Sequence, residues 1–312
     1  MKNRQHKVNY RAFGLILSSE ITLPELLQID GMVDVIDIEI VKGDLSKQWL
    51  ECSNEGNPFV IDKGMVMFQL PNIAIFSIKE GCQITVSPLK DYEEDIARLW
   101  ILGTCMGAIL MQRKILPLHG SVVAIDGKAY AIVGDSGAGK STLASAFLKK
   151  GFKLLTDDVI AVSFTDNNRP YVTPSYPQQK LWLKSLHHFG MDRVDYQPLI
   201  DREDKFAVPV LSQFADTPLA LAGIFELVKK DIQEVEMLPI ESLERIFRLY
   251  HHTYRNFFLE RSGLMEWHFQ TTSKLASKVD FYQLRRPAEK FTAHDLADLI
   301  LRTLKVEKII NV

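Results

Sequence analysis

The stretch that decides the fold is Gly134-Asp135-Ser136-Gly137-Ala138-Gly139-Lys140-Ser141, which fits G-x-x-x-x-G-K-[ST] at every fixed position. This pattern predicts a phosphate-binding loop (P-loop) when a strand precedes it and a helix follows it. Residues 129–133 are apolar and typical of a strand, and residues 140–150 are typical of a helix that stops at Gly151. The context therefore favours a P-loop over a glycine-rich turn that only caps a helix.

Each residue type in this loop has a physical task. The glycines let the backbone curl, so that its N–H groups and the positive end of the helix can hold phosphate oxygens. Lys140 would lie on the β- and γ-phosphates, and the Ser141 hydroxyl would bind Mg²⁺. We therefore expect ATP and Mg²⁺ as cofactors. The expected nucleotide-binding residues are Gly134, Asp135, Ser136, Gly137, Ala138, Gly139, Lys140, Ser141 and Thr142.

Two adjacent carboxylates, Asp157 and Asp158, follow a predicted strand at 152–155 and begin only 17 residues after Lys140. This spacing leaves room for one helix, one turn and one short strand, so we expect both acids beside the phosphate loop. One could hold Mg²⁺, directly or through water, and the other could accept a proton from an attacking hydroxyl. The alternative is a solvated Asp-Asp turn.

His119 lies in the strand pair that precedes the loop. A single histidine is more often structural than catalytic. The hairpin around Asp126-Gly127, however, could bring its ring close to the carboxylates or to the γ-phosphate.

The flanking sequence predicts two domains. Short β-type runs within residues 33–40, 65–68, 73–76 and 84–86 predict a small β-rich accessory domain over residues 1–92. Residues 93–312 would form the catalytic domain, which would begin with a helix over residues 91–113.

Further along, the proline-rich residues 164–220 predict mobile loops. Strands are expected at 222–228 and 281–284. Apolar residues at helical spacing predict a helix over 241–261 with its apolar stripe in the core. A final helix over 292–304 would begin with a capping box, in which Thr292 is paired with Asp295.

Composition excludes several classes of protein. The chain has 312 residues, 46% hydrophobic and 24% charged, with a net charge of −2, which is typical of a globular protein and predicts neither a nucleic acid nor a membrane as partner. Its longest apolar run, residues 99–111, is shorter than the ~20 residues of a membrane-spanning helix. Three cysteines without a CxxC pair suit a reducing, cytoplasmic location and predict no zinc cluster.

A known family shares these motifs. Leu118-His119-Gly120, the P-loop segment 133–141 and Thr156-Asp157-Asp158 together resemble the catalytic domain of HPr kinase/phosphorylase. The resemblance implies an α/β fold: a P-loop kinase core of the HPr kinase/phosphoenolpyruvate carboxykinase type with a small β-rich N-terminal domain. It also implies that Asp157 is the base that activates a serine hydroxyl. His119 and Lys140 would be the other catalytic residues, and Ser141 and Asp158 the metal ligands.

The chain departs from the family pattern in two places. Thr142-Leu143 stands where the family often has Glu-Thr, and the glycine-rich downstream signature of the bifunctional enzymes is missing. These departures weaken the case for the phosphorylase reaction and for HPr itself as the substrate.

The layout is more similar to the HPr-kinase-related tailoring kinases of lasso-peptide biosynthesis. The similar elements are Tyr-x-x-x-Gly-Leu at 10–15 and Tyr-x-Leu-x-Arg-Pro at 282–287. This resemblance implies transfer of phosphate to the C-terminal serine of a precursor peptide. The partner would be a peptide or small protein with an acceptor serine, and the kinase a homo-oligomer.

Three other functions stay open: a bifunctional HPr serine kinase/phosphorylase, a non-catalytic nucleotide sensor, and a kinase for a small molecule. Lys205 and Arg285 are candidates for phosphate or substrate contacts. Lys180 and Lys184 could meet an acidic peptide terminus.

Overall fold

The computed structural model describes residues 7–31, 33–53, 56–199 and 202–305. The chain forms two compact units, Met1–Pro117 with Thr253–Thr271 and Leu118–His252 with Thr272–Val312. The predicted boundary at residue 92 therefore differs from the observed division. The helical residues after 92 pack on the first sheet, and a late segment of the chain returns to it.

The first unit is built on one mixed sheet. In the described residues this sheet has the strand order β3-β1-β2-β4-β8-β7-β6-β5. The predicted runs at 65–68, 73–76 and 84–86 are strands, whereas the run at 33–40 becomes a strand only from Ile38. The strands are β1 (Val8–Ala12), β2 (Leu15–Ser19), β3 (Leu27–Gln28), β4 (Ile38–Lys42), β5 (Phe59–Asp62), β6 (Met65–Leu70), β7 (Ala74–Lys79) and β8 (Gln83–Pro88).

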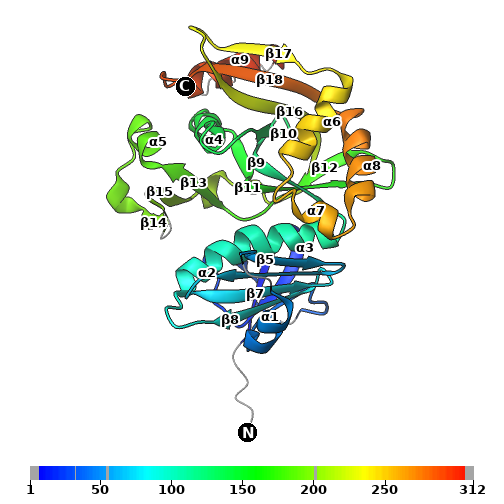
Figure 1. Ribbon diagram of the computed structural model, residues 1–312. Helices are drawn as coiled ribbons and strands as arrows, with labels where there is room; N and C mark the ends of the chain where they lie inside the picture. The colour runs from blue at the N-terminus through cyan, green and yellow to red at the C-terminus, as the bar shows by residue number, and fades with distance from the viewer. Residues whose placement is uncertain (1–6, 32, 54–55, 200–201, 306–312) are drawn as a thin grey trace. The chain divides into compact units, whose positions relative to one another are not determined.

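The predicted helix over 91–113 forms, with a π-helical turn in its middle. It consists of α2 (Glu94–Trp100), η1 (Ile101–Cys105) and α3 (Met106–Gln112) and lies across the sheet (Figure 1). Trp100 packs on Phe68, with ring centroids 5.4 Å apart. A shorter helix, α1 (Ser46–Cys52), buries Trp49 against Met67 and Ile75.

The prediction of a single helix over 241–261 is wrong. It is broken into α6 (Ser242–His251) and α7 (Phe258–Arg261), and Arg255 between them has a left-handed φ of +53°. The apolar stripe is also not one core face, because Leu243 and Phe247 are 81% and 63% exposed. The reason is that the two pieces belong to different units, with α7 and the start of α8 (Met265–Ala276) in the first.

The second unit has a mixed sheet that carries the P-loop. In the described residues its order is β10-β9-β11-β12-β16-β18-β17, with a further pairing of β10 to β16. The predicted hairpin is confirmed: β9 and β10 are antiparallel, and Asp126 and Gly127 both have positive φ between them. The strands are β9 (Leu116–Ile125), β10 (Lys128–Val133), β11 (Lys153–Phe164), β12 (Pro170–Thr173), β16 (Leu219–Lys230), β17 (Glu236–Pro239) and β18 (Asp280–Pro287).

Two helices bury their apolar sides on this sheet. Phe147 of α4 (Lys140–Lys149) and Ile300 of α9 (Ala293–Thr303) share one core with Phe225 of β16. A fully buried side chain of this size contributes about 1.5–3 kcal/mol. Helix α9 confirms the predicted final helix but not its capping box, because within the described residues the Thr292 side chain makes no capping hydrogen bond.

The predicted loop region 164–220 contains regular structure instead. Its central part forms a separate three-stranded sheet of β13 (Gln178–Trp182), β14 (Gln197–Leu199) and β15 (Arg202–Pro209). Helix α5 (Leu183–His188) follows β13, and two 3₁₀ turns, η2 (Arg193–Asp195) and η3 (Leu211–Gln213), complete the region. Prolines misled the prediction because they lie at strand ends and edges, where a missing N–H is tolerated.

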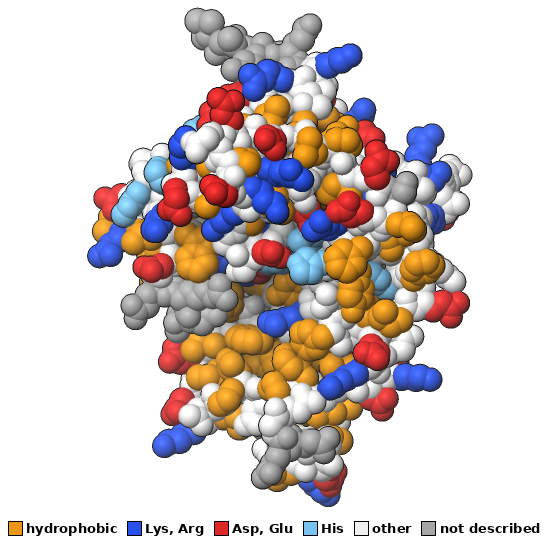
Figure 2. Space-filling view, turned by 45° about the horizontal axis from the view of Figure 1, so that its top comes forward, with side chains coloured by type: hydrophobic (Ala, Val, Ile, Leu, Met, Phe, Trp, Pro, Cys, Tyr) orange, Lys and Arg blue, Asp and Glu red, His pale blue; other side chains and the backbone are white. Residues whose placement is uncertain are grey.

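The surface in Figure 2 shows Lys and Arg side chains interspersed with Asp and Glu. Among the described residues, no helix combines the length and the apolar character that crossing a bilayer requires. Cys52 and Cys82 are exposed free thiols and Cys105 is a buried one.

Candidate phosphate-binding site

The glycine-rich segment lies between β10 and α4, as its sequence predicts. Gly134, Gly137 and Gly139 have φ values of +147°, +78° and +111°, which favour glycine. At Gly134 a side chain is also excluded by space, because a Cβ atom there would lie 2.5 Å from the Leu227 carbonyl oxygen of β16. The loop is thus pressed against the sheet and curls into the N-terminus of α4.

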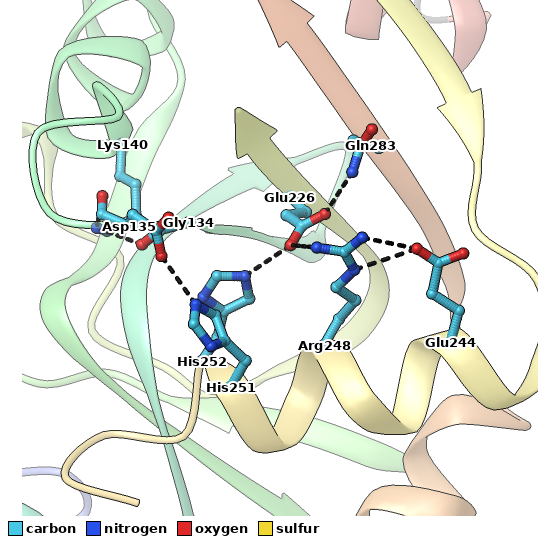
Figure 3. Close-up of polar contacts among 9 residues, drawn as sticks. All are labelled: Gly134, Asp135, Lys140, Glu226, Glu244, Arg248, His251, His252 and Gln283. Atoms are coloured by element: carbon cyan, nitrogen blue, oxygen red, sulfur yellow. Dashed lines mark hydrogen bonds and ion pairs between the residues drawn. The ribbon is translucent and has the colours of Figure 1, made fainter. Parts of the chain in front are cut away.

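Lys140 is buried at the start of α4. Its Nζ donates hydrogen bonds to the carbonyl oxygens of Gly134 at 2.8 Å and Asp135 at 3.0 Å (Figure 3). Burial lowers the pKa of Lys140, and the negative charges of Asp157 and Asp158 oppose this shift. The ammonium group is therefore held inside the curl of the loop, beside both acids.

Asp157 is the most enclosed acid of the site. Its Oδ1 accepts hydrogen bonds from the hydroxyls of Ser141, at 2.9 Å, and Ser121, and its Oδ2 accepts one from the Lys180 backbone N–H at 2.8 Å. The side chain of Asp157 is almost fully buried. A serine hydroxyl and a carboxylate side by side are the hard oxygen ligands that Mg²⁺ prefers, so these residues fit that ion.

Asp158 lies at a kink in β11. The strand continues to Phe164, so both acids stand within a strand and not after its end, as the sequence suggested. Asp158 has a φ of +81°, which is unusual for a residue with a side chain, and the Thr156 hydroxyl donates to the Val159 carbonyl across the kink. The kink gives the two neighbouring acids different surroundings.

The Asp158 carboxylate lies beside cationic or potentially cationic groups. Its Oδ2 lies 2.7 Å from Lys180 Nζ, and its Oδ1 lies 3.4 Å from His119 Nδ1. Burial acts to raise the pKa of Asp158, but Lys180 and His119 outweigh it and hold this pKa well below its ordinary value. Lys180 and His119 therefore favour the ionised form of Asp158.

The structure brings His119 to the acids, as the hairpin suggested. Its Nδ1 is also 3.0 Å from the Asp158 carbonyl oxygen. Ser121, which the sequence reasoning missed, stands two residues further along β9. Because side chains alternate along a strand, His119 and Ser121 point to the same face, and this period could have revealed Ser121.

His119, Lys140 and both acids line a small cavity of about 40 Å³. Lys205 lines it too, as does Lys180, whose pairing with Asp158 the sequence did not reveal. Arg285 instead lies near Glu236, with Nη1 3.9 Å from Oε2. The lining residues are His119, Gly120, Ser136, Gly137, Gly139, Lys140, Ser141, Thr142, Asp157, Asp158, Lys180, Trp182 and Lys205.

A buried polar network stands beside the loop (Figure 3). Glu226 of β16 accepts from Arg248 at 3.2 Å and from Gln283 at 2.8 Å, and lies 2.9 Å from His252 Nε2. The His252 carbonyl accepts from the His119 backbone N–H at 2.8 Å. The network therefore fixes the backbone that carries His119.

The loop is also joined to the end of α6 on its outer side. His251 Nε2 lies 2.9 Å from Asp135 Oδ1 (Figure 3). The hydrogen bond to His251 lowers the pKa of Asp135, although burial opposes the shift. Asp135, predicted as a nucleotide-binding residue, thus points its carboxylate to α6, and its carbonyl to Lys140.

Comparison with known proteins finds similarity over part of the chain. It is 39% identical over 83 residues to the HPr kinase/phosphorylase of Mycoplasmopsis pulmonis, which is 25% of this chain and 27% of that protein. It is 26% identical over 167 residues to the HPr kinase/phosphorylase of Lachnoclostridium phytofermentans, 47% of this chain and 52% of the relative. The chain thus spans between about a quarter and about half of the length of these relatives.

The HPr(Ser) kinase/phosphatase of Coxiella burnetii aligns with 61% of this chain and 93% of its own, with a TM-score of 0.32 and 16% identity. No protein-family model matches the chain.

Proposed function

We propose that this protein is a kinase that transfers the γ-phosphoryl group of ATP to a serine hydroxyl of a peptide or small protein. The observation that supports this most is the set of contacts around Asp157 and Asp158, which stand beside the P-loop lysine and serine. The partial similarity to HPr kinase/phosphorylases agrees with it. The catalytic role falls to the second unit. The accessory role of the β-rich residues 1–92 stays a prediction.

Nucleotide binding is assigned to the loop and Lys140. The backbone N–H groups of the curl and the Lys140 ammonium would hold the β- and γ-phosphates. Ser141 and Asp157 would hold Mg²⁺, which when bound neutralises charge on the phosphates. Because phosphoryl transfer passes through a loose transition state, positioning and charge would supply most of the rate.

We assign the two acids in the reverse of the order that the family resemblance implies. Asp157 is buried and its oxygens accept three hydrogen bonds, one from the metal-binding candidate Ser141, so it suits a metal ligand better than a base. Asp158 is more exposed and is oriented by Lys180 and His119. Asp158 is a weak base because its pKa is lowered, so it would chiefly orient the serine hydroxyl by accepting its hydrogen bond, and would take the proton late, as the new O–P bond forms and ADP leaves.

Two substitutions separate these roles. Asp158→Asn should keep Mg²⁺-dependent ATP binding and lower phosphoryl transfer about 10²–10⁴-fold, the usual effect of losing a general base. Asp157→Asn should instead weaken the Mg²⁺ dependence of ATP binding, measured by titration calorimetry with and without the metal. Asp166→Asn, an exposed acid after the same strand, serves as the control.

An Asp157→Asn protein with normal Mg²⁺-dependent ATP binding but little phosphoryl transfer would support the order that the family resemblance implies, with Asp157 as the base. Lys140→Ala should abolish turnover in either case. A Lys140→Ala variant with normal turnover would refute the site itself.

The finer proposal for the acceptor is the C-terminal serine of a lasso-peptide precursor. It is supported only by the short elements at 10–15 and 282–287. Mass spectrometry of candidate peptides after incubation with ATP and Mg²⁺ tests it by locating the modified residue. Pyrophosphate release from phosphorylated product and inorganic phosphate would favour a bifunctional enzyme. Tight ATP binding without any phosphorylated product would favour a sensor.

A further inference from the structure

Two imidazoles and one carboxylate meet at the outer side of the P-loop, where α6 ends. Asp135 comes from the loop, His251 is the last residue of α6, and His252 follows it. Each of the three side chains offers one ligand atom, and these atoms lie within 4.8 Å of one another. None of the three belongs to the described lining of the small cavity that contains Lys140 and the acids. Asp135, His251 and His252, here called the outer cluster, are therefore separate from the expected Mg²⁺ site.

The outer cluster has nearly the spacing that a single ion requires. His251 Nε2 lies 2.9 Å from Asp135 Oδ1, and the two histidine rings have centroids 4.8 Å apart (Figure 3). Zinc binds nitrogen and oxygen atoms at about 2.0–2.2 Å, so the ligand atoms of a tetrahedral ion lie about 3.4 Å apart. The spacings in the cluster fall on both sides of this value. Asp135 and His251 are exposed, so small rotations of their side chains can bring the three atoms onto one ion.

A buried carboxylate orients the third member of the outer cluster. His252 Nε2 lies 2.9 Å from Glu226 Oε1, and because a carboxylate only accepts hydrogen bonds, Nε2 carries the proton. In the neutral ring, Nδ1 then has the lone pair that a metal ion needs. Histidines that bind metals almost always donate their other ring N–H to a carboxylate, a carbonyl or a water molecule. His252 already has this support.

The charges around the outer cluster also favour a cation. Both histidines stand at the C-terminal end of α6, where the partial charge of a helix is negative. The nearby guanidinium of Arg248 is compensated by two carboxylates, Glu226 at 3.2 Å and Glu244 at 2.7 Å. The ammonium of Lys140 is turned to the inside of the loop, where it donates to loop carbonyls. A divalent ion at the outer cluster would therefore meet little net repulsion.

The chemistry of these ligands selects the class of ion. Imidazole nitrogen suits Zn²⁺ and its neighbours among the transition metals, whereas Mg²⁺ prefers oxygen ligands and water. Two imidazoles and one carboxylate leave the fourth position of a tetrahedral zinc ion to water, as in several zinc enzymes. The set contains no cysteine, so cysteine spacing in the sequence gave no indication of it.

We propose that Asp135, His251 and His252 bind a divalent transition metal of the zinc class, which fastens the P-loop to the end of α6. This site goes beyond the proposed kinase function and does not depend on it. The Asp135 carbonyl accepts from Lys140 Nζ at 3.0 Å, and the His252 carbonyl accepts from the His119 backbone N–H at 2.8 Å. An ion on the outer cluster would therefore hold the backbone on both sides of the phosphate site.

Titration calorimetry with Zn²⁺ tests the site, with excess Mg²⁺ present so that the oxygen ligands beside the P-loop are occupied. His251→Gln removes an exposed ligand and should weaken Zn²⁺ binding more than about 100-fold, because losing an outer support alone costs about 10–100-fold. Glu226→Gln removes that support from His252 and should weaken Zn²⁺ binding about 10–100-fold. Circular dichroism before each titration checks that the variant is folded.

Two other histidines supply matched controls. His187→Gln removes an exposed imidazole of α5, and His119→Gln removes the imidazole beside Asp158. Both variants should keep the wild-type affinity for Zn²⁺ within about twofold, as expected for substitutions outside the site. The second control separates the outer cluster from zinc bound among the acids.

Three results would overturn the proposal: a wild-type protein that does not bind Zn²⁺, a His251→Gln variant that binds it as tightly as the wild type, or a His119→Gln variant that loses binding to the same extent. The first two would mean that His251 and Asp135 form only an exposed ion pair. Phosphoryl transfer enters none of these measurements. The metal site can therefore fail while the kinase proposal stands, and the kinase proposal can fail while the metal site stands.

Discussion

His268 is a buried histidine whose protonation state can be measured through stability. Its ring is 2% exposed, and Nε2 lies 2.8 Å from the Thr253 hydroxyl. Burial lowers the pKa of His268 to about 4 from 6.5. The folded protein therefore keeps this ring neutral at pH values where the unfolded chain already binds a proton.

The contribution of His268 to stability should be full above pH 6.5 and should decline as the pH falls toward 4. Between pH 7.5 and pH 5 we expect a loss of about 2 kcal/mol in the free energy of unfolding. Urea titrations of the wild type and His268→Gln measure it, and the variant should show a shallower pH dependence. His187→Gln, an exposed histidine, should retain the wild-type slope. An unchanged slope in His268→Gln would contradict the assignment.

At the scale of elements, one carboxylate joins a strand to the end of a helix. Glu226 of β16 is 1% exposed and contacts Arg248 and His252 from the end of α6. Burial acts to raise the pKa of Glu226, but hydrogen bonds from His252 and Gln283 and the charge of Arg248 lower it overall. The ionised carboxylate is thus part of what holds α6 to the sheet.

The contact of Arg248 with buried Glu226 can be compared with an exposed one on the same side chain, because Arg248 also pairs with the exposed Glu244 at 2.7 Å. Glu226→Gln removes one partner from a buried network and should lower stability by up to about 3 kcal/mol. Glu244→Gln removes an exposed pair on the same arginine and should change stability by about 0.5 kcal/mol or less. Urea denaturation gives both values. Equal effects would mean that the buried pair has no special role.

Glu226→Gln should also lower phosphoryl transfer, because His252 holds the His119 backbone.

At the scale of the whole molecule, the first unit is discontinuous in sequence. Residues 253–271 return to it, and Phe258 of α7 packs edge-on against Phe59 of β5 with ring centroids 5.6 Å apart. In the same unit, the Tyr254 ring fits against Gly107, where a Cβ atom would lie 2.6 Å from it. The first unit therefore cannot be completed until residues 253–271 have been synthesised, which happens after residues 118–252 of the second unit.

Phe258→Ala should destabilise the first unit by about 3–5 kcal/mol, the usual effect of removing a buried phenyl ring. Phe257→Ala, at a ring that is 43% exposed, should lower stability much less. Thermal unfolding of the full chain measures both. Because the P-loop lies in the second unit, ATP affinity should stay within about twofold in each variant. A matching loss of ATP binding in Phe258→Ala would show that the units are not energetically separate.

Several local elements of this protein could be predicted from the sequence alone. The P-loop, the strand before it, the helix after it and the Asp126-Gly127 hairpin were all predictable, because glycine conformation and apolar periodicity act over a few residues. The same reasoning failed at 241–261, where the helical period continued across a break between two units. It also failed at 164–220, where the prolines predicted loops but the chain forms a three-stranded sheet.

Only the tertiary structure decided which groups meet. Asp157 finds Ser141 16 residues earlier, Ser121 36 residues earlier and the Lys180 backbone 23 residues later, and His251 reaches Asp135 over 116 residues. Sequence periodicity carries no information on partners so far apart, because strand order and helix placement set them. The motif thus determined where phosphate could bind, while the packing of β9, β11 and β13 decided that Asp157 faces the Ser141 hydroxyl and that Asp158 faces Lys180 and His119.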